Sequence, residues 1–540
     1  MSFETRILIV NNIKLPVNAS YKEAFSIAKR KISAFLPSAA SHSYSIYKKS
    51  IDARKNQDIR LVYSVAAKGD LSALDGASVK DGDISLISPS SVPMPDFGEE
   101  KMTAPPLIVG SGPSGLFAAL LLAEKGYSPI LIERGGCVAE RKAAVDRFNK
   151  LHVLDTETNI QFGAGGAGTF SDGKLVTRIN DPLSGYVLRT LVKFGAPEEI
   201  LYLAKPHIGT DVLSVVIERI IDEIERFGGR ILYHTKYLSS EKRGGISIAL
   251  TSRGEIEYGA LILAVGHSAR DTYHMMMREG YLVEPKPFSV GMRIEHLKEN
   301  IDRAMFGDLA GHKNLPYAEY NLSHNTKERG VYTFCMCPGG EVVAAASEEL
   351  GLVVNGMSHH ARDGRNSNAA VVCSIFKEDY GATPEKAIEF QRNIEKAAFR
   401  AGGGDYSAPI ITVGDFLRGI ARTEPTDVIP TYMNSSMHTR ITSPEKYLPG
   451  IVCDSIKNAL IDFDKKIKGY AAPSAVLTGA ETRTSSPVRI VRNNETRLAV
   501  GKDNVYPCGE GAGYAGGITS AAIDGIKTAI AVIERYRPII

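Results

Sequence analysis

A glycine-rich turn holds the residues whose types and spacing point most directly to chemistry. It follows an apolar run at 107–109 and consists of Gly110, Ser111, Gly112, Pro113, Ser114 and Gly115. In this G-x-G-x-x-G spacing the first glycine permits a tight bend and the second lets the backbone approach a pyrophosphate, while the third lets helix and strand pack closely. The helix expected next would add N–H donors and a partial positive charge at its N-terminus. The turn therefore predicts a phosphate-binding site.

One acidic residue completes the pattern. Glu133 ends the apolar run PILIE, which is expected to form the second strand of a nucleotide-binding unit. A carboxylate at that place can accept hydrogen bonds from a ribose. Strand, helix and acid agree, so a dinucleotide site explains the segment better than an unrelated glycine-rich turn. The turn alone leaves open which dinucleotide is bound.

Three further segments favour FAD over NAD. The run NIQFGAGGAGTFSDGKL has enough glycine to lie flat against a planar ring. The strand-like ALILAVG precedes a turn of the kind seen in FAD proteins, and the C-terminal CGEGAGYAGGITSAAIDG offers a carboxylate and a helix N-terminus. A helix N-terminus stabilises the anionic edge of reduced flavin. The residues assigned to FAD from these segments are Gly165, Gly166, Gly168, Thr169, Ala264, Gly266, Gly509, Glu510, Gly516, Gly517 and Ile518.

These segments, with KPFSVGMRIEH and GAETRTSSPVRI, resemble the family of bacterial FAD-dependent, or NAD(FAD)-utilising, dehydrogenases, whose activities are largely unassigned. The resemblance covers nearly the whole chain and implies one FAD and an oxidoreductase activity. We also place Arg134, Arg141 and Tyr237 in the expected FAD site. The chain departs from the pattern at Ala164, where Glu is expected, and at Glu510, where most flavoproteins have Asp.

The chain has a single dinucleotide fingerprint. A nicotinamide donor, NAD(P)H, would therefore bind transiently or in a pocket of another type. A reduced carrier protein is an equally open alternative. The small-molecule substrate is not specified by the sequence, and no metal site is expected because the cysteines have no zinc spacing.

Candidate catalytic residues lie in the segment 479–492, just before the C-terminal flavin segment. Arginine forks suit carboxylate or phosphate groups, so we assign substrate contacts to Arg483, Arg489 and Ser485. The alternative is a polar strand whose arginines are satisfied by neighbouring acids.

Other polar positions allow two interpretations each. Four residues in KPFSVGMRIEH could line a pocket at a domain junction or belong to a hinge strand: Ser289, Arg293, Glu295 and His296. His267 could approach the flavin or cap a turn. Cys335 and Cys337 could form a redox dithiol, but small buried thiols beneath a glycine turn are the favoured interpretation.

The expected fold class is α/β, with a single Rossmann-type FAD-binding domain, an inserted α+β domain and a small N-terminal α/β module. We expect the module at 1–95, a proline-rich linker at 96–106, the FAD-binding domain at 107–290 and 476–540, and the inserted substrate or cap domain at 291–475.

Composition excludes several classes. The chain has 540 residues, a net charge of +3 and six cysteines, so a disulfide framework is not expected. No segment is apolar enough for a membrane span, and a cytoplasmic location is expected. Residues 29–60 are locally basic, which raises two alternatives: a flavin-dependent RNA-modifying or RNA-binding protein, and a non-catalytic FAD-bound sensor. A solvated face is the favoured interpretation, so nucleic acid is not the expected partner; the oligomeric state is left open.

Overall fold

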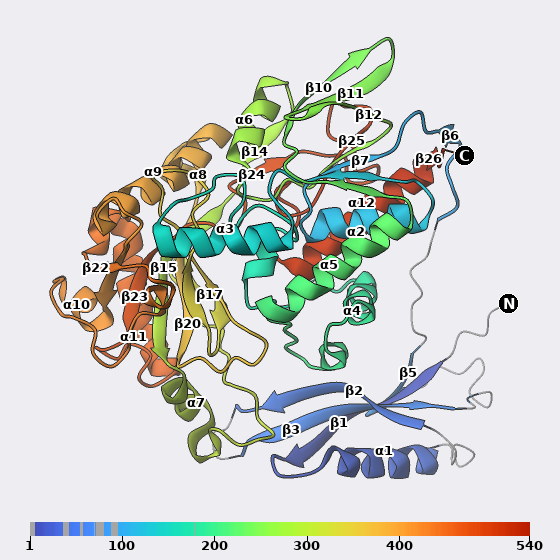
Figure 1. Cartoon of the computed structure of the whole chain (residues 1–540). Helices are drawn as coiled ribbons and strands as arrows, with labels where there is room; N and C mark the ends of the chain where they lie inside the picture. The colour runs from blue at the N-terminus through green and yellow to red at the C-terminus, as the bar shows by residue number, and fades with distance from the viewer. Residues whose placement is uncertain are drawn as a thin grey trace.

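The computed structural model describes residues 6–35, 43–54, 58–69, 71, 80–87, 95–177 and 179–539. The chain forms a nucleotide-binding α/β part, a part built on a large antiparallel sheet, and a small N-terminal sheet with one helix (Figure 1). The expected fold class is confirmed. No helix among the described residues is both long and apolar enough to cross a lipid bilayer.

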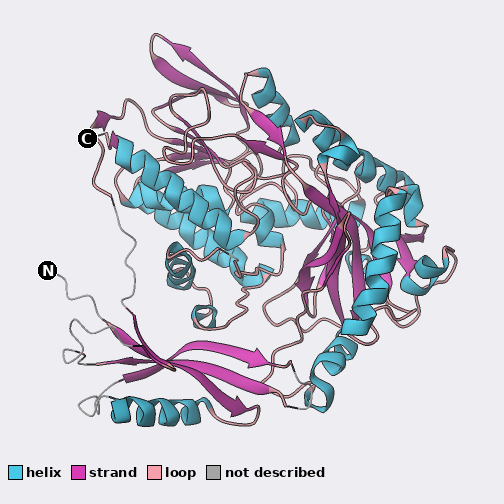
Figure 2. Cartoon of the chain, turned by 180° about the vertical axis from the view of Figure 1, so that it is seen from behind, coloured by secondary structure: helices cyan, strands magenta, loops and turns pink. Residues whose placement is uncertain are grey.

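The N-terminal module is a sheet covered on one face by a helix, as Figure 2 shows from behind. Its strands, in the order β2-β3-β1-β5-β4, and its helix have these bounds: β2 Ser43–Asp52, β3 Arg60–Lys68, β1 Ile7–Pro16, β5 Ile84–Ile87, β4 Lys80–Asp81 and α1 Tyr21–Phe35. Buried residues alternate with exposed ones along the second half of β1, and Ala24, Ala28 and Ile32 recur at helical spacing on α1. Backbone bonds join Lys49 to Tyr202 and Ala204, so the module docks on the nucleotide-binding part.

The nucleotide-binding part is a parallel sheet in the order β25-β13-β7-β8-β9. Its strands are β25 Val505–Pro507, β13 Leu261–Leu263, β7 Leu107–Val109, β8 Ile130–Ile132 and β9 Arg230–Leu232. Its helices are α2 Pro113–Glu124, α3 Val138–Leu151, α4 Leu183–Lys193, α5 Thr210–Arg226, α6 Arg270–Arg278 and α12 Ile518–Arg535. Helices α2, α5 and α12 pack together beside the sheet (Figure 1). The chain thus returns at its C-terminus to complete the sheet begun at residue 107.

The inserted part is built on a seven-stranded sheet in the order β16-β17-β20-β15-β23-β21-β22. Its strands are β16 Ser323–Asn325, β17 Gly330–Cys337, β20 Asn366–Ile375, β15 Phe288–Leu297, β23 Val476–Glu481, β21 Ala408–Thr412 and β22 Thr439–Ile441. A hairpin, β18 Glu341–Ala344 and β19 Val354–Met357, and five helices complete it: α7 Lys298–Phe306, α8 Lys377–Tyr380, α9 Pro384–Gly402, α10 Val413–Arg418 and α11 Gly450–Lys466. All neighbours except β21 and β22 run antiparallel, so this sheet is no second dinucleotide-binding fold.

Two expected domain assignments need correction. Strand β23 pairs with β15 and β21, so the second stretch of the FAD-binding domain begins after this strand and not at residue 476. The expected linker is partly structured, because β6 Glu100–Lys101 pairs with β26 Tyr536–Arg537. The strand-like ALILAVG contains β13 of the parallel sheet, and the residues before it form a separate antiparallel sheet of β10 Tyr237–Arg243, β11 Ile246–Thr251 and β12 Gly254–Tyr258.

Packing of α2 against α12 depends on Gly525. A Cβ at this position would lie 2.1 Å from the Ser114 carbonyl oxygen. Gly525→Val should therefore lower the free energy of unfolding by at least about 1–3 kcal/mol, since the two helices would have to separate. The control is Gly450→Ala, whose Cβ would meet nothing within 4 Å. Urea unfolding followed by circular dichroism measures both, and equal midpoints would contradict the packing argument.

Candidate functional site

The first glycine-rich turn is held by close backbone contacts. Gly110 has a φ of +101°, and a Cβ there would lie 2.4 Å from the Ala264 carbonyl oxygen. A Cβ on Gly115 would lie 1.9 Å from the Gly110 carbonyl oxygen. Both positions need glycine because backbone occupies the space where a side chain would start. The turn therefore joins β7, β13 and α2 in the way its spacing predicts.

The second glycine of the turn differs from its neighbours. A Cβ on Gly112 would have only the Gly166 Cα within 4 Å, at 3.9 Å, so the space in front of it is open. Gly112 is also the N-cap of α2, and no side chain of the described residues caps this helix. Open space in front of free helix N–H groups fits a phosphate group. The residues present thus fit the pyrophosphate of a dinucleotide.

Glu133 ties the turn to the next glycine run. Its Oε2 accepts hydrogen bonds from the Ser111 N–H at 3.0 Å and the Ser111 hydroxyl at 2.7 Å, and its Oε1 accepts from the N–H groups of Gly135 at 2.9 Å and Gly163 at 3.0 Å. The side chain is buried. Its contact with a ribose stays a prediction, whereas its bonds to these four donors give it a second task in shaping the site.

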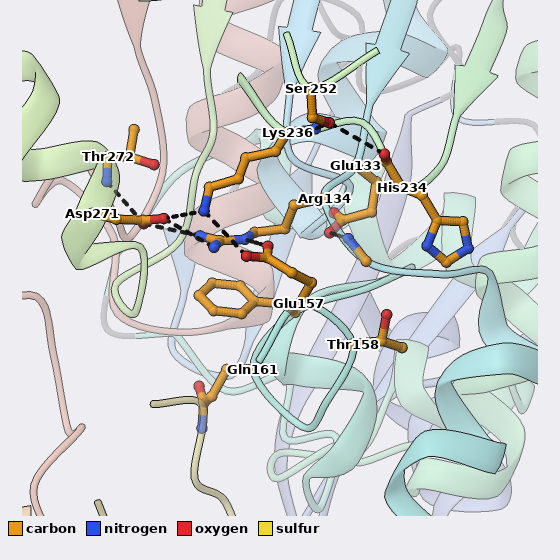
Figure 3. A network of polar contacts seen from close by, with 12 residues as sticks. Glu133, Arg134, Glu157, Thr158, Gln161, His234, Lys236, Ser252, Asp271 and Thr272 are labelled. Atoms are coloured by element: carbon orange, nitrogen blue, oxygen red, sulfur yellow. Dashed lines mark hydrogen bonds and ion pairs between the residues drawn. The ribbon is translucent and has the colours of Figure 1, made fainter. Parts of the chain in front are cut away.

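Arg134 lies in an ion-pair network beside Glu133 (Figure 3). Its Nε donates to Glu157 at 2.6 Å, its two Nη atoms donate to Asp271 at 3.0 Å each, and Lys236 bridges the same two acids. The guanidinium also lies 4.2 Å from the centre of the Phe162 ring. Arg134 therefore joins separate segments of the chain, and its bonds to two protein carboxylates give it a structural task.

Arg141 supports the glycine run through side-chain hydrogen bonds to its backbone. It is fully buried and donates to the carbonyl oxygens of Asn159, Ile160 and Ala164 at 2.8, 2.6 and 2.7 Å. Burial lowers the pKa of Arg141 to about 9. A Cβ on Gly163 would lie 2.7 Å from the Arg141 Cδ, so the run is shaped by this arginine. Arg141 positions the loop expected to touch FAD.

The glycine run meets the start of α12. A Cβ on Gly168 would lie 3.1 Å from Cγ1 of Ile518, and the Thr519 hydroxyl donates to the Leu175 carbonyl oxygen at 2.8 Å. Thr169 is buried in the same run, and Gly165 needs glycine because a Cβ would lie 2.2 Å from the Thr169 hydroxyl. Two segments far apart in the sequence thus face each other, as expected for a flavin site.

The C-terminal turn ends in an open helix N-terminus. A Cβ added at Gly516 or Gly517 would meet nothing within 4 Å, and no described side chain caps α12. Gly509 is fixed by its N–H bond to Asp524 at 2.7 Å, and Asp524 is paired with Arg492. Free N–H groups and a partial positive charge at this helix start fit the anionic edge of reduced flavin.

Two ionisable side chains lie at this turn. Burial raises the pKa of Glu510 to about 7 and lowers the pKa of His267 to about 3. His267 Nδ1 lies 4.0 Å from Glu510 Oε1, and His267 Nε2 has no hydrogen-bond partner among the described residues. The loop at Gly266 packs on this turn, since a Cβ on Gly511 would lie 2.5 Å from the Gly266 carbonyl oxygen. A neutral imidazole with one free nitrogen therefore lies beside a protonatable carboxyl group.

Tyr237 makes its contacts within the protein, and its contact with FAD stays a prediction. Its hydroxyl bonds to the Ser240 hydroxyl at 2.5 Å, and its ring packs in a core cluster with Tyr258 and Tyr281. Desolvation in this cluster raises the pKa of the Tyr237 hydroxyl. The phenol is therefore part of a core cluster of the protein.

The three candidate catalytic residues are spread along one segment. Arg483 is only 4% exposed, pairs with Glu395 at 3.1 Å and donates to the Ser347 hydroxyl. Ser485 is half-buried in the following turn. Arg489 is exposed on β24 Val488–Ile490, with its guanidinium 5.3 Å from the centre of the Tyr514 ring. Substrate contact by these residues stays a prediction, and Arg489 is the one whose side chain is exposed.

The residues from KPFSVGMRIEH are buried in the inserted sheet. The Ser289 hydroxyl bonds to that of Tyr332, Glu295 accepts from the Thr431 N–H and hydroxyl, and His296 Nε2 donates to the Tyr470 carbonyl oxygen. Burial lowers the pKa of His296 to about 4 and raises the pKa of Glu295. These side chains are therefore bonded within the inserted sheet, and their assignment to a pocket at the domain junction stays a prediction.

A buried charged cluster between the two large parts was missed from the sequence. Asp172, three residues after Thr169, is paired with Arg362 and bonded to Ser358 of the insert, and Lys174 lies 3.6 Å from the same carboxylate. Nearby, Arg293 pairs with Glu481 at 3.0 Å, and burial raises the pKa of Glu481 to about 7. The sequence signal for this cluster is SDGK, a strongly polar stretch that directly follows the glycine run.

The turn, the glycine run and the open start of α12 together define a flavoprotein of the Rossmann type. The family described as "FAD-dependent protein, C-terminal domain-like" matches residues 287–484, an "NAD(P)-binding Rossmann-like domain" matches 108–168, and a domain of unknown function matches 8–68. An uncharacterized protein of Clostridium beijerinckii is 44% identical over 533 residues, which is 98% of each chain. The chain belongs to this family of FAD-dependent proteins, and FAD is its cofactor.

Solved structures match the chain only at low similarity. The complex of CtdE with FAD covers 80% of this chain and 84% of its own, with 12% identity and a TM-score of 0.32. The halogenase PltM covers 79% of this chain and 67% of its own, with 12% identity and a TM-score of 0.35.

A substitution at Gly112 should affect cofactor binding without affecting folding. Gly112→Val places a side chain in open space, so we expect the FAD-free chain to melt as the wild type does while FAD affinity falls about 10- to 150-fold or more, because charge-assisted contacts to the pyrophosphate are lost. The contrasting variant is Gly115→Ala, whose Cβ meets backbone and should lower the melting temperature itself. Flavin absorbance per chain and thermal melting measure both; retained FAD in Gly112→Val would contradict the assignment.

Glu510 gives the FAD-free chain a pH-dependent stability. Its pKa of about 7 in the folded chain lies above the ordinary value of 4.5, so the folded state keeps a proton that the unfolded state releases. The free energy of unfolding should therefore fall as pH rises from about 4.5 to about 7 and then level off. Glu510→Gln should make that fall shallower in urea titrations across this range, whereas the exposed Glu328→Gln should not. The same slope in both variants would rule out this origin.

Proposed function

We propose that the protein is an FAD-dependent oxidoreductase that acts on a small molecule bound between the FAD-binding domain and the insert. Bound FAD would supply two-electron chemistry through its N5 atom. The observation that carries the proposal is the continuity of segment 163–175. Gly168 and Leu175 contact the start of α12. Between them, Asp172 and Lys174 enter the charged cluster with Arg362.

Specific residues would hold the cofactor and the substrate. Gly112 and the start of α2 would bind the pyrophosphate, Glu133 a ribose, and the N–H groups at Gly517 and Ile518 the flavin edge. Lys174 would present a charge toward substrate because its Nζ is the cation that the FAD segment contributes to the cluster. Arg489, exposed beside Tyr514, would attract an anionic substrate.

The electron donor belongs to the proposal as well. With one fingerprint turn, NAD(P)H would bind transiently outside a Rossmann site, and a reduced carrier protein would serve equally. An anaerobic screen of NADH, NADPH and a library of small metabolites, followed by bleaching of the flavin absorbance, tests the reaction class. Bleaching by one class of compound supports it. A flavin that dithionite reduces but no compound reduces or reoxidises would favour a sensor.

Two arginine variants distinguish substrate contact from structure. Arg489→Ala should leave folding and FAD content unchanged and raise KM for an anionic substrate about 10- to 150-fold, the value of one charged hydrogen bond. Arg483→Ala should instead lower the melting temperature, because it removes one of the two arginines that neutralise the buried Glu395. Steady-state kinetics and melting of both variants test this. If Arg483→Ala changes only KM, its buried ion pair is not its main role.

A further inference from the structure

Two cysteines lie close together at the end of β17. Cys335 and Cys337 are free, and the Cys337 thiol donates to the Cys335 carbonyl oxygen at 3.4 Å. The pairing of β17 with β20 shifts register between Phe334 and Cys337, and Cys335 has a φ of 44°. A non-glycine residue rarely adopts this left-handed conformation. The bulge is therefore an irregular place in the sheet, and it holds the Cys337 thiol against the backbone of Cys335.

Two cations flank the pair, the buried Arg293 and the half-buried Lys174. Arg293 Nη2 donates to the Cys335 carbonyl oxygen at 2.5 Å and lies 4.0 Å from Cys337 Sγ. Lys174 Nζ donates to the carbonyl oxygen of Met336, the residue between the two cysteines. The neighbouring Cys337 thiol and these two cations favour the thiolate of Cys335 and lower its pKa. Two cations beside a pair of neighbouring cysteines favour formation of a thiolate, which is the form that reacts in thiol–disulfide exchange.

The thiols also lie next to the segment that binds FAD. Lys174, which bonds Met336, is followed directly by Leu175, whose carbonyl oxygen accepts from Thr519 at the start of α12. That helix start is where the flavin edge would bind. A single lysine side chain therefore links the backbone of the dithiol to the cofactor segment. Cys373, by contrast, is buried in the sheet, and its thiol bonds to the Ser374 carbonyl oxygen at 3.8 Å.

We propose that Cys335 and Cys337 form a redox-active dithiol that exchanges two electrons with FAD. This rests on the proposed function only in requiring a flavin that accepts and releases electrons. Two thiols and oxidised FAD give a Cys335–Cys337 disulfide, reduced FADH⁻ and one proton. One hydride equivalent passes to the flavin, and the reverse reaction consumes the same proton. The dithiol gives the protein a second two-electron store, and it suits a disulfide or another thiol-reactive substrate.

The test is an anaerobic dithionite titration of the full-length holoprotein after air oxidation. Wild type should take up about two two-electron equivalents per FAD before the flavin is fully reduced, and Cys335→Ala and Cys337→Ala about one. The matched control is Cys373→Ala, which removes a buried thiol from the same sheet and should still take about two equivalents. A long-wavelength charge-transfer band in partly reduced wild type, absent from Cys335→Ala, would place the thiolate against the flavin.

A second measurement does not use the flavin signal. The oxidised holoprotein is alkylated in denaturant and analysed by mass spectrometry, and Cys335 and Cys337 should then be unmodified and joined by a disulfide. After dithionite has fully reduced the holoprotein, both cysteines should be alkylated. Uptake of about one equivalent by wild type, with both thiols alkylated after oxidation, would overturn the inference and leave the oxidoreductase proposal intact. A flavin that takes up no electrons would overturn both.

Discussion

The site depends on one buried carboxylate, Glu133, and the four hydrogen bonds that it accepts. These bonds come from the fingerprint turn, from the strand end and from the glycine run, which are distant in sequence. A buried charge is stable only when its lone pairs are satisfied, so the carboxylate forces the three segments into one arrangement. Arg141 completes this from the other side, because its guanidinium holds the glycine run by its carbonyl oxygens. The shape of the expected dinucleotide site is therefore set by contacts within the protein itself.

Buried charge also joins the two large parts. Asp172 faces Arg362, and farther along the interface Arg270 and Arg483 share Glu395. Removing one partner from such a pair leaves an uncompensated charge, which costs more than the pair contributes. If the insert moved away from the FAD-binding domain, these charged side chains would therefore lose their ion-pair partners. This favours a fixed interface in which the charged cluster keeps its geometry.

The cofactor segments could be predicted from the sequence, because glycine spacing reports backbone constraints that few other folds share. Gly110 and Gly115 contact backbone as expected, and Gly112 leaves the expected open space. The binding partners of the arginines could not be predicted from the sequence. Whether Arg483 meets a substrate or Glu395 depends on α9, whose residues are about ninety positions away, and no local pattern encodes that pairing. The boundary at residue 476 was wrong for a related reason, since an apolar strand fits either sheet until its partners are known.

The connection between the two large parts is a ribbon of two short strands, β14 Val283–Pro285 and β24 Val488–Ile490, in which Pro285 is paired with Val488. The chain thus enters the insert and leaves it at the same place. A gene segment encoding residues 286–487 could be exchanged between relatives at this ribbon, provided that the recipient supplies the same paired ends and the buried partners Asp172 and Arg270. The architecture accordingly suits a lineage in which one FAD-binding scaffold acquires new specificities by replacing a whole module at once.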